Sequence, residues 1–490
     1  MELKSNEVNC GGTFPRDYGQ WESGFTETVD GITYNGYAIG GIVHTESGIY
    51  MSLVEDNQTN PETDTTGSWR VWFDKKVLYD RQVLDDIAFW IDINGASSLG
   101  STRVDRGGNM QMMEYLFAQR QNVLMDANGN YCHLNRNDGR YTEDGELIID
   151  TSTGQLLSKW ANADMMIIIP EYYGRVLPVD IGGTTKYYLY LSAIPLPGGF
   201  TIPRQVVGVT KATNISGTMR SVPGYVSDNS ATIETFWSRA QARSKNHGIA
   251  NLDYQNYLLW YMMGKYGYRD SQGCKTSDGT LVWGVGLDGT ENTSGSSTDG
   301  WGRQYNIKHG QTIRLGLNDG NVAVTDAAGG TAHSVNVAGF CDAWGQRWED
   351  RGGLCSVGDN VYCWRHNWLP SGTPTDDTFA NVDCVKLKRS NASGVYGDMN
   401  VVPSGYHQGV YMISKGSLDG VSYNDYYWYA SGGQLWIFGG VSYSGSYCGL
   451  ASANSDFGWS LSTSDFSARL AYYGSIKRVT TSQLAALLAS

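Results

Sequence analysis

The chain has 490 residues, a length that predicts two to four folding units and room for a large buried core. Charged residues make up only 17% and aromatic residues 12%, which is typical of short strands and ordered loops and argues against a disordered chain. The net charge of -13 argues against binding to nucleic acid or to an anionic membrane surface, because both are themselves negatively charged.

The sequence also bears on membrane insertion and on metal binding. No run of eighteen apolar residues occurs, and the first residues, MELKSNEVNC, lack the apolar stretch of a secretory signal peptide. We therefore expect synthesis in the cytoplasm and no insertion into a membrane. The eight cysteines form no CxxC pair and no zinc-type spacing with histidine, so we interpret them as small buried side chains and expect no metal site.

Residues 1–78 predict a small β-rich module, because GITYNGYAIGGIVHTESGIY alternates turn residues with short apolar runs. The strand SGIYMSL, followed by NQTNP and then by Trp69 and Trp72, resembles the small chitin-binding-type carbohydrate modules. That resemblance implies that the two tryptophans stack on sugar rings. The alternative is that they form the core of the module.

Residues 79–130 predict a helical connector. The stretches VLYDRQVLDDIAFWIDI and MQMMEYLFAQRQNVLM repeat apolar residues at spacings of three and four, the pattern of an amphipathic helix. The polar stretch NGASSLGSTRVDRGGN lies between them and is too long an interruption for a coiled coil.

Residues 131–474 predict a large α+β domain. ADMMIIIPEYY predicts a strand that ends at Pro170, and KYYLYLSAIPLPGGFTIPRQVVGV predicts at least two more. Two helices are expected next, over TIETFWSRAQARSKN and LDYQNYLLWYMMGKYGY, and short strands with long polar loops follow them. Strands, two helices and a loop-rich β region form the order of a C-type-lectin-like fold, which we therefore expect here.

The segment LWIFGGVSYSGSYCGLASANSDFGWSLSTSDFSARLAYYG closes this domain, and residues 475–490 follow it as a C-terminal tail. The segment resembles the C-terminal part of lectin-fold proteins that retroelements diversify, such as phage major tropism determinants and related tail proteins of gut bacteria. The resemblance covers about residues 131–474 and implies the formylglycine-generating-enzyme-like subclass of the fold.

The resemblance divides the closing segment into two kinds of position. The framework residues are Gly439, Gly440, Gly445, Gly449, Leu450, Arg469 and Leu470. The variable, ligand-binding positions are Val441, Ser442, Tyr443, Ser444, Ser446, Tyr447, Cys448, Ala451, Ser452, Ser455, Asp456, Phe457, Trp459 and Ser460.

Physical chemistry supports the same division. Glycine suits a tight turn, leucine can anchor a segment in the core, and the guanidinium of arginine donates several hydrogen bonds in a fixed geometry. The residues between them resemble antibody loops, where aromatic rings supply rigid contact area and serine supplies adaptable hydrogen bonds. We therefore expect a solvent-facing recognition surface, in which Tyr443, Tyr447, Phe457 and Trp459 touch the ligand. The alternative is an ordinary Ser- and Gly-rich loop with scattered aromatics.

A second aromatic cluster precedes this segment. Tyr423, Tyr426, Tyr427, Trp428 and Tyr429 place five aromatic residues within seven positions. Because a half-buried strand hides only every other side chain, we expect some of these rings to be exposed beside the recognition surface. The alternative is a strand that is buried on both faces.

The resemblance implies a receptor-binding, tropism-determining tail protein of a phage or prophage, located in the virion tail and not an enzyme. Its implied partners are a bacterial surface protein or glycan and other phage tail proteins, in a homotrimer. Two alternatives stay open: a bacterial cell-surface adhesin of the same fold, and a formylglycine-generating-type oxidase. The oxidase would need a reactive pair among Cys341, Cys355 and Cys363.

Other candidate sites rest on composition alone. Glu349 with Asp350, and Asp376 with Asp377, are neighbouring carboxylates, but adjacent acids do not face each other across a substrate as glycoside hydrolysis requires. The polar stretches 286–300 and 316–321 offer oxygen ligands for a structural cation, although solvated turns explain them more simply. No cofactor is expected.

Overall fold

The computed structural model describes most of the chain. Within the first 80 residues the described parts are 17–23, 26–29, 32–34, 42–44, 48–52, 58–66 and 68–74. The rest is described from 81 to 489, apart from 182–183, 285–306, 326–330, 406, 415–420 and 442–443. The chain forms two compact units, Met1–Leu84 and Asp85–Ser490, with an α+β architecture that has more strand than helix.

The N-terminal unit is built from strands, as its turn-rich sequence predicts. One sheet has the order β1 (Asp17–Gln20), β4 (Ile42–His44), β5 (Gly48–Ser52), β6 (Trp69–Asp74). A separate hairpin pairs β2 (Glu27–Val29) with β3 (Ile32–Tyr34). Trp69 and Trp72 lie on β6, but their side chains are outside the described part of the structure, so the sugar-stacking role stays a prediction.

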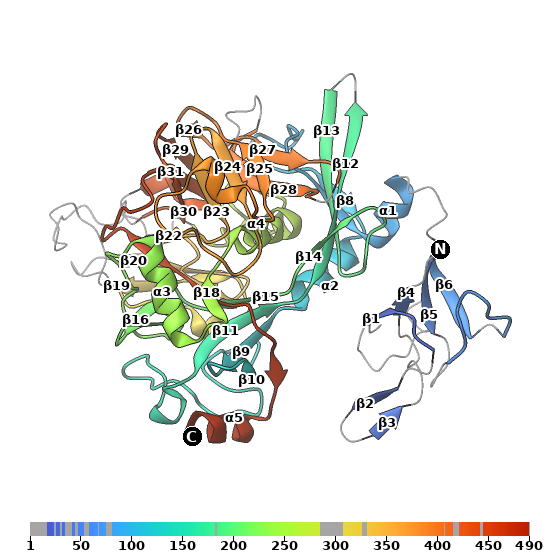
Figure 1. Cartoon of the computed structure of the whole chain (residues 1–490), viewed down its shortest axis with the longest axis horizontal. Helices are drawn as coiled ribbons and strands as arrows, with labels where there is room; N and C mark the ends of the chain where they lie inside the picture. The colour runs from blue at the N-terminus through green and yellow to red at the C-terminus, as the bar shows by residue number, and fades with distance from the viewer. Residues whose placement is uncertain are drawn as a thin grey trace. The chain divides into compact units, whose positions relative to one another are not determined.

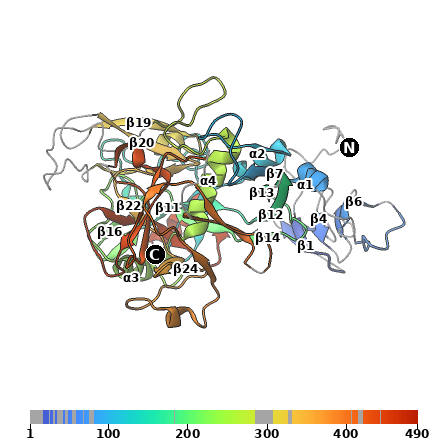
Figure 2. The ribbon, with the colours of Figure 1, turned by 90° about the horizontal axis from the view of Figure 1, so that it is seen from above.

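Three large sheets organise the second unit (Figures 1 and 2). The seven-stranded sheet has the order β18 (His247–Ile249), β33 (Leu470–Tyr472), β15 (Gln205–Gly208), β11 (Asp164–Ile169), β9 (Gln121–Met125), β10 (Asn130–His133), β34 (Lys477–Arg478). The five-stranded sheet has the order β14 (Phe200–Ile202), β12 (Tyr172–Ile181), β13 (Thr184–Ser192), β7 (Phe89–Asp92), β8 (Arg106–Gly108). The six-stranded sheet has the order β26 (Gly394–Val395), β29 (Tyr426–Tyr429), β31 (Gly449–Phe457), β30 (Leu435–Gly439), β22 (Trp348–Asp350), β32 (Phe466–Ala468).

Smaller sheets and the helices complete this unit. The small sheets join β16 (Thr213–Ile215) to β17 (Thr218–Arg220), β19 (Gly320–Thr325) to β20 (Thr331–Val337) and β21 (Phe340–Cys341), β23 (Leu354–Val357) to β24 (Asn360–Cys363) and β25 (Val385–Lys388), and β27 (Met399–Val402) to β28 (Gly409–Ser414). The α-helices are α1 (Arg81–Ile87), α2 (Met110–Ala118), α3 (Ile233–Arg243), α4 (Leu252–Tyr266) and α5 (Thr481–Ala489). Among the described residues, none of the helices has both the length and the apolar content needed to cross a membrane.

Helix α4 is the central helix of the larger unit, and both views place it near the middle (Figures 1 and 2). Almost every residue from Leu252 to Gly264 is buried, as expected for a helix that is enclosed on all sides. Asn251 caps its N-terminus by accepting hydrogen bonds from the next turn, and Gly267 ends it in a left-handed conformation with φ of 70°. The two helices expected after the first strands are therefore confirmed as α3 and α4.

The prediction of a helical connector over 79–130 is wrong. Among the described residues of this stretch, α1 and α2 are the helices, and β7 and β9 replace the second half of each expected helix. Phe89–Asp92 and Gln121–Met125 are buried almost throughout and each contains three apolar residues in a row, so they fit an interior strand as well as a helix. Pairing with β13 and β11 decides in favour of strands and makes this segment part of the larger unit.

The last residues are also part of the larger unit rather than a free tail. Strand β34 pairs in parallel with β10, and α5 packs against β10 and the 3-10 turn Ser158–Trp160. On α5, Leu484 is fully buried in the main core, and the hydroxyl of Thr481 donates to Asp144 at 3.1 Å. The seven-stranded sheet thus joins residues from both ends of the unit.

Helix α5 offers a matched test of this packing. Leu484→Ala should lower the free energy of unfolding by about 2–5 kcal/mol, because it leaves a cavity in the core. Leu487→Ala, on the same helix at 45% exposure, should change it by less than about 1 kcal/mol. Chemical unfolding followed by near-UV circular dichroism measures both. Equal losses for the two variants would contradict the placement of α5.

Candidate ligand-binding surface

The closing segment of the lectin-like resemblance lies mostly inside the six-stranded sheet. Strand β31 is an interior strand, paired in parallel with β29 and antiparallel with β30. Between β30 and β31 the chain forms a loop that ends in a 3-10 turn, Gly445–Tyr447. The segment is therefore a scaffold strand with one short loop at its edge.

Hydrogen bonds anchor the described residues of this loop. Within it, the amide of Ser444 donates to the carbonyl of Val441 at 2.8 Å. From outside it, the side-chain amide of Gln272 donates to the carbonyls of Gly445 at 3.0 Å and Cys448 at 2.9 Å. At its end, Asp425 accepts from the amide of Ala451 at 2.8 Å. The partly buried Gln272 and the buried Asp425, both distant in sequence, thus anchor the end of the loop and the start of β31.

Two framework glycines are required by this geometry. Gly440 has φ of 76°, and a Cβ added there would approach Cys448 Sγ to 2.5 Å. At Gly449 a Cβ would overlap the carboxylate of Asp425, which is the group that anchors the start of β31. Any larger residue at either position would displace an anchor of the loop.

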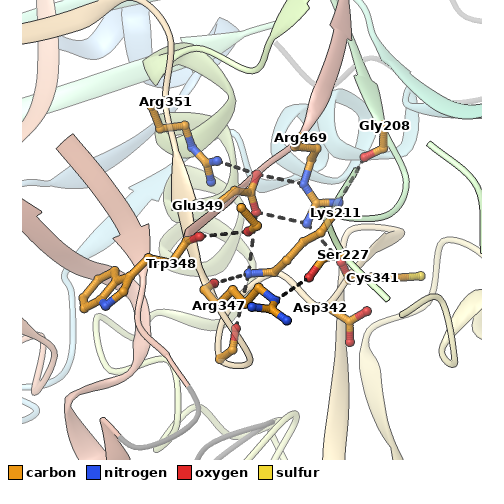
Figure 3. A network of polar contacts seen from close by, with 12 residues as sticks. Gly208, Lys211, Ser227, Cys341, Asp342, Arg347, Trp348, Glu349, Arg351 and Arg469 are labelled. Carbon is orange, nitrogen blue, oxygen red and sulfur yellow. Dashed lines mark hydrogen bonds and ion pairs between the residues drawn. The ribbon is translucent and has the colours of Figure 1, made fainter. Parts of the chain in front are cut away.

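The framework arginine lies in a buried polar network (Figure 3). All five N–H groups of Arg469 have acceptors: its Nε and one Nη2 bond reach Glu349 at 3.0 and 3.2 Å, and the others reach the carbonyls of Gly208, Val209 and Cys341 at 2.8–3.1 Å. Arg469 is 0% exposed. It is the hydrogen-bonding fork that the sequence suggests, and it connects β32 and β33 to β22.

Glu349 is the one carboxylate at the centre of this network. Its side chain is 1% exposed and pairs with Arg469 and Arg351, while Lys211 Nζ lies 3.9 Å away. Burial alone would raise the pKa of Glu349, but the three cations outweigh it and hold the pKa at about 2. Burial lowers the pKa of Lys211 to about 8, although Glu349 acts in the opposite direction.

The network continues to the variable segment. Arg351 donates through Nε and Nη2 to Oε1 of Gln255 on α4, at 3.2 and 2.5 Å. Gln255 in turn donates to the carbonyl of Leu450 at 2.6 Å. The framework residues Leu450 and Leu470 are both fully buried. One continuous chain of contacts therefore runs from Arg469 through Glu349 to the first residues of β31.

The expectation that the whole variable segment faces solvent is wrong. The exposed positions are Ser446, Tyr447 and Ser460, and the partly buried ones are Ser444, Asp456 and Phe457. The buried ones are Val441, Cys448, Ala451, Ser452, Ser455 and Trp459. Ser442 and Tyr443 lie outside the described residues. Residues 449–455 of β31 are buried without alternation, so other parts of the larger unit cover both faces of this strand.

Trp459 is the clearest correction. It is 2% exposed and belongs to the same buried cluster as Leu435, Val441 and Phe466. Phe457 packs edge-on against Phe466 with ring centroids 5.1 Å apart and is only partly exposed. Of the four expected contact residues, Tyr447 is therefore the one with a largely exposed ring in the described structure.

Tyr447 is part of a cluster of three rings that we name the aromatic patch: Tyr426, Trp428 and Tyr447. Its ring centroid lies 4.8 Å from that of Tyr426 and 6.1 Å from that of Trp428, and the latter two are 4.6 Å apart. Tyr447 is 47% exposed, and its two neighbours are partly exposed. Underneath, Trp428 packs edge-on against buried Trp348 at 5.3 Å.

The aromatic run before β30 has the expected mixture of inner and outer rings. Tyr423 and Tyr427 are buried, whereas Tyr426, Trp428 and Tyr429 are partly exposed. Tyr426, Tyr427 and Trp428 follow the alternation of a strand, and Tyr429 at the end of β29 departs from it. Sequence reasoning placed this run beside the recognition surface but did not identify Tyr426 and Trp428 as the rings that contact Tyr447. It also missed the anchors Gln272 and Asp425, whose roles have no local sequence signal because their partners are far along the chain.

The cysteines and the Glu349–Asp350 pair that the sequence suggests as catalytic candidates are buried in the core. Cys341, Cys355 and Cys363 are buried, and burial raises the pKa of each thiol, to about 12 for Cys341. Glu349 is held in the ion network, while Asp350 is fully buried without a hydrogen-bond partner among the described residues, and burial raises its pKa. The thiols of Cys341, Cys355 and Cys363 therefore lack the low-pKa environment of a reactive cysteine.

Of the two stretches suggested as cation sites, 286–300 and 316–321, the structure describes the second. Residues 286–300 lie outside the described residues. Within 316–321, Asp319 Oδ2 accepts hydrogen bonds from Lys265, Tyr261 and Tyr266 at 2.5–2.7 Å, and its Oδ1 accepts from the amide of Ala338. Protein donors therefore occupy the carboxylate that a cation would need.

Comparison with known proteins adds no relative: no family model matches the chain, and no curated protein matches it.

The ion network predicts a large effect of a small change. Glu349→Gln leaves three buried cations without their carboxylate and should lower the free energy of unfolding by about 3–5 kcal/mol at pH 7. Because its folded pKa lies below the usual 4.5, Glu349 stabilises the fold above pH 4.5, and this contribution is lost as pH falls toward 2. The variant should lack that part of the acid dependence.

Glu143→Gln is the matched control, since Glu143 is 44% exposed and pairs with exposed Arg478. It should cost less than about 1 kcal/mol. Urea unfolding of both variants between pH 3 and pH 7 gives the comparison. A loss for Glu349→Gln no larger than that of the control would show that the network does not support the fold.

Proposed function

We propose that this chain is a receptor-binding protein of a phage or prophage tail and that it binds a bacterial surface ligand through the aromatic patch. The observation that carries the proposal is the contact of three rings, Tyr426, Trp428 and Tyr447, beside a loop whose end is anchored by hydrogen bonds from Gln272. Exposed aromatic rings in mutual contact are typical of interaction sites, because they offer large apolar area at low entropy cost.

The finer fold assignment is part of the same proposal. We propose that the larger unit has a C-type-lectin-like fold of the formylglycine-generating-enzyme-like subclass. Its support is the order of strands, then α3 and α4, then a loop-rich β region whose last strand, β33, joins β15 and β18. In this arrangement the variable segment and its anchors belong to one rigid scaffold.

The proposed binding depends on a loop that the protein holds rigid and on the exposed side chains that this loop carries. Gln272 and Asp425 fix the loop before any ligand arrives, so little conformational entropy is lost on binding. Ser446 is exposed next to Tyr447 and offers a hydroxyl that both donates and accepts. A single patch of this size binds weakly, and the proposed homotrimer on a virion tail would raise the affinity through avidity.

The proposal favours recognition over catalysis. The exposed residues of the loop are serine and tyrosine, which can be exchanged without disturbing Arg469 or Glu349. The thiols that an oxidase would need, Cys341, Cys355 and Cys363, have pKa values raised by burial. Their burial agrees with small core residues and not with nucleophiles.

Cell binding tests this proposal. The fluorescently labelled full chain is added to a panel of bacterial strains, and the binding curve is measured on a strain that responds. Tyr447→Ala and Trp428→Ala should each weaken binding at least about tenfold, as expected for central aromatic contacts. Leu99→Ala, at 67% exposure and outside the patch, should leave binding unchanged.

Two further arms sharpen the result. Protease treatment of the cells removes a protein receptor, and periodate oxidation removes a glycan receptor, so the arm that abolishes binding identifies the ligand class. Binding that is unchanged when Tyr447 and Trp428 are both replaced by alanine, in a variant with an unchanged unfolding midpoint, would refute the aromatic patch as the contact surface.

A further inference from the structure

A second candidate site lies at the N-terminus of α4. A cavity of about 320 Å³ is lined by residues of β15, of the end of β33 and of the segment that follows β24, and by Asn251, the cap of α4. A larger cavity of about 470 Å³ shares the wall residue Arg365 with it. Both volumes lie within the range of small-molecule sites, roughly 300–1,000 Å³.

Arg365 presents hydrogen-bond donors at the wall between the two cavities. Its Nε reaches both carboxylate oxygens of Asp253, at 3.2 and 3.0 Å, and this contact orients the planar guanidinium. Nη1 and Nη2 have no acceptor among the described residues. Neither nitrogen is enclosed by protein atoms, and 34% of the side chain is exposed. The N–H groups of Nη1 and Nη2 are therefore open to a ligand.

Arg204 and His366 bring further donors to the smaller cavity. Both residues are exposed and line it. Arg204 donates through Nη2 to the carbonyl of Gly474 at 3.1 Å, just after the end of β33, and its other N–H groups have no acceptor in the described structure. The imidazole of His366 has a ring N–H in either tautomer. The accessible polar groups of these side chains are therefore mainly donors.

The smaller cavity is positive, although the chain as a whole carries a net charge of -13. No aspartate or glutamate is among the described residues that line it. Because Arg365 and Asp253 offset each other's charge, the surplus comes from Arg204 and from the start of α4 at Asn251. The N-terminus of a helix carries roughly half an elementary positive charge. The cavity therefore attracts an anion and repels a cation.

The type of donor selects the anionic group. The planar fork of an arginine matches two oxygens of a carboxylate or a phosphate, and such charge-assisted hydrogen bonds are roughly twice as strong as neutral ones. Two half-buried aromatic residues, Phe200 in the larger cavity and Tyr473 in the smaller one, also line the space. Aromatic side chains of this kind provide apolar contact area for the body of a small organic molecule.

We infer that the cavity at Arg365 is a binding site for a small organic oxyanion, a carboxylate or a phosphate ester. Nη1 and Nη2 of Arg365 donate to two oxygens of the anion, Arg204 adds a second positive charge, and Phe200 or Tyr473 contacts the body of the ligand. This inference does not rest on the proposed function, because the two cavities share no residue with the aromatic patch.

Saturation-transfer NMR on the full chain tests the inference with matched probes. Each anion is compared with an uncharged counterpart: benzoate with benzyl alcohol, D-glucuronate with D-glucose, and glycerol 3-phosphate with glycerol. At least one anion should give a signal that its counterpart lacks. The anion that responds also tells whether the site takes a carboxylate or a phosphate.

Two substitutions then locate the bound anion. Arg365→Lys keeps a cation beside Asp253 but loses the planar fork, and it should weaken binding at least about tenfold. Arg204→Gln removes the second charge at an exposed position, so it should leave the unfolding midpoint unchanged and weaken binding at least about threefold. Because Arg204 is exposed, this second variant tests the site even if Arg365→Lys unfolds.

Arg136→Gln is the matched control. Arg136 is exposed and, like Arg204, donates through Nη2 to a backbone carbonyl, that of Ala118 at 2.8 Å, but it lines neither cavity. Its substitution should leave the signal of the anion unchanged.

Three results would overturn the inference. One is that no anion gives a signal that its uncharged counterpart lacks. Another is that Arg204→Gln binds the anion as tightly as the unchanged chain does. The third is loss of the signal in Tyr447→Ala, because the anion would then bind at the aromatic patch.

Discussion

A single buried carboxylate among three cations is the interaction on which the larger unit depends. Glu349 belongs to β22, whose neighbours in the sheet are β30 and β32, and it pairs with Arg469 and Arg351 where water cannot screen the charges. Arg469 in turn binds the carbonyls at the end of β15, and Arg351 reaches Gln255 on α4. Two large sheets and the central helix thus meet at one ion network, whose members are costly to remove singly.

This ion network explains why the closing segment contains both buried residues, which support the fold, and exposed residues, which we propose contact the ligand. Gln255 extends the chain of contacts to the carbonyl of Leu450, and Asp425 fixes the next residue of β31. Buried side chains therefore anchor β31, and in the described part of the loop before it Tyr447 carries an exposed ring. Because that ring rests on Tyr426 and Trp428, the proposed contact surface combines a changeable loop with a strand that lies outside the variable segment.

Much of the fold followed from the sequence, and the failures have physical causes. The helices expected over 232–246 and 252–268 correspond closely to α3 (Ile233–Arg243) and α4 (Leu252–Tyr266). Phe89–Asp92 was misassigned because a run of three apolar residues satisfies either period, and only pairing with β13 decides. The framework role of Arg469 was predictable, but its partner Glu349 lies 120 positions away, where one sequence gives no signal. The burial of Ser452 and Trp459 was missed for a similar reason. A segment rich in serine and aromatic residues has the composition of a binding loop whether the fold exposes the segment or buries it.

The central claim is that positions in the closing segment divide into contact and support according to burial. A substitution library over residues 441–460, scored in parallel for protease resistance and for binding to a responding bacterial strain, tests it most directly. The account predicts that changes at exposed Ser446 and Tyr447 alter binding while the protein stays resistant, and that changes at buried Ser452 and Ser455 reduce resistance first. Equal loss of protease resistance in both groups would contradict the claim. Bacterial binding that does not change with substitutions at Ser446 and Tyr447 would also contradict it.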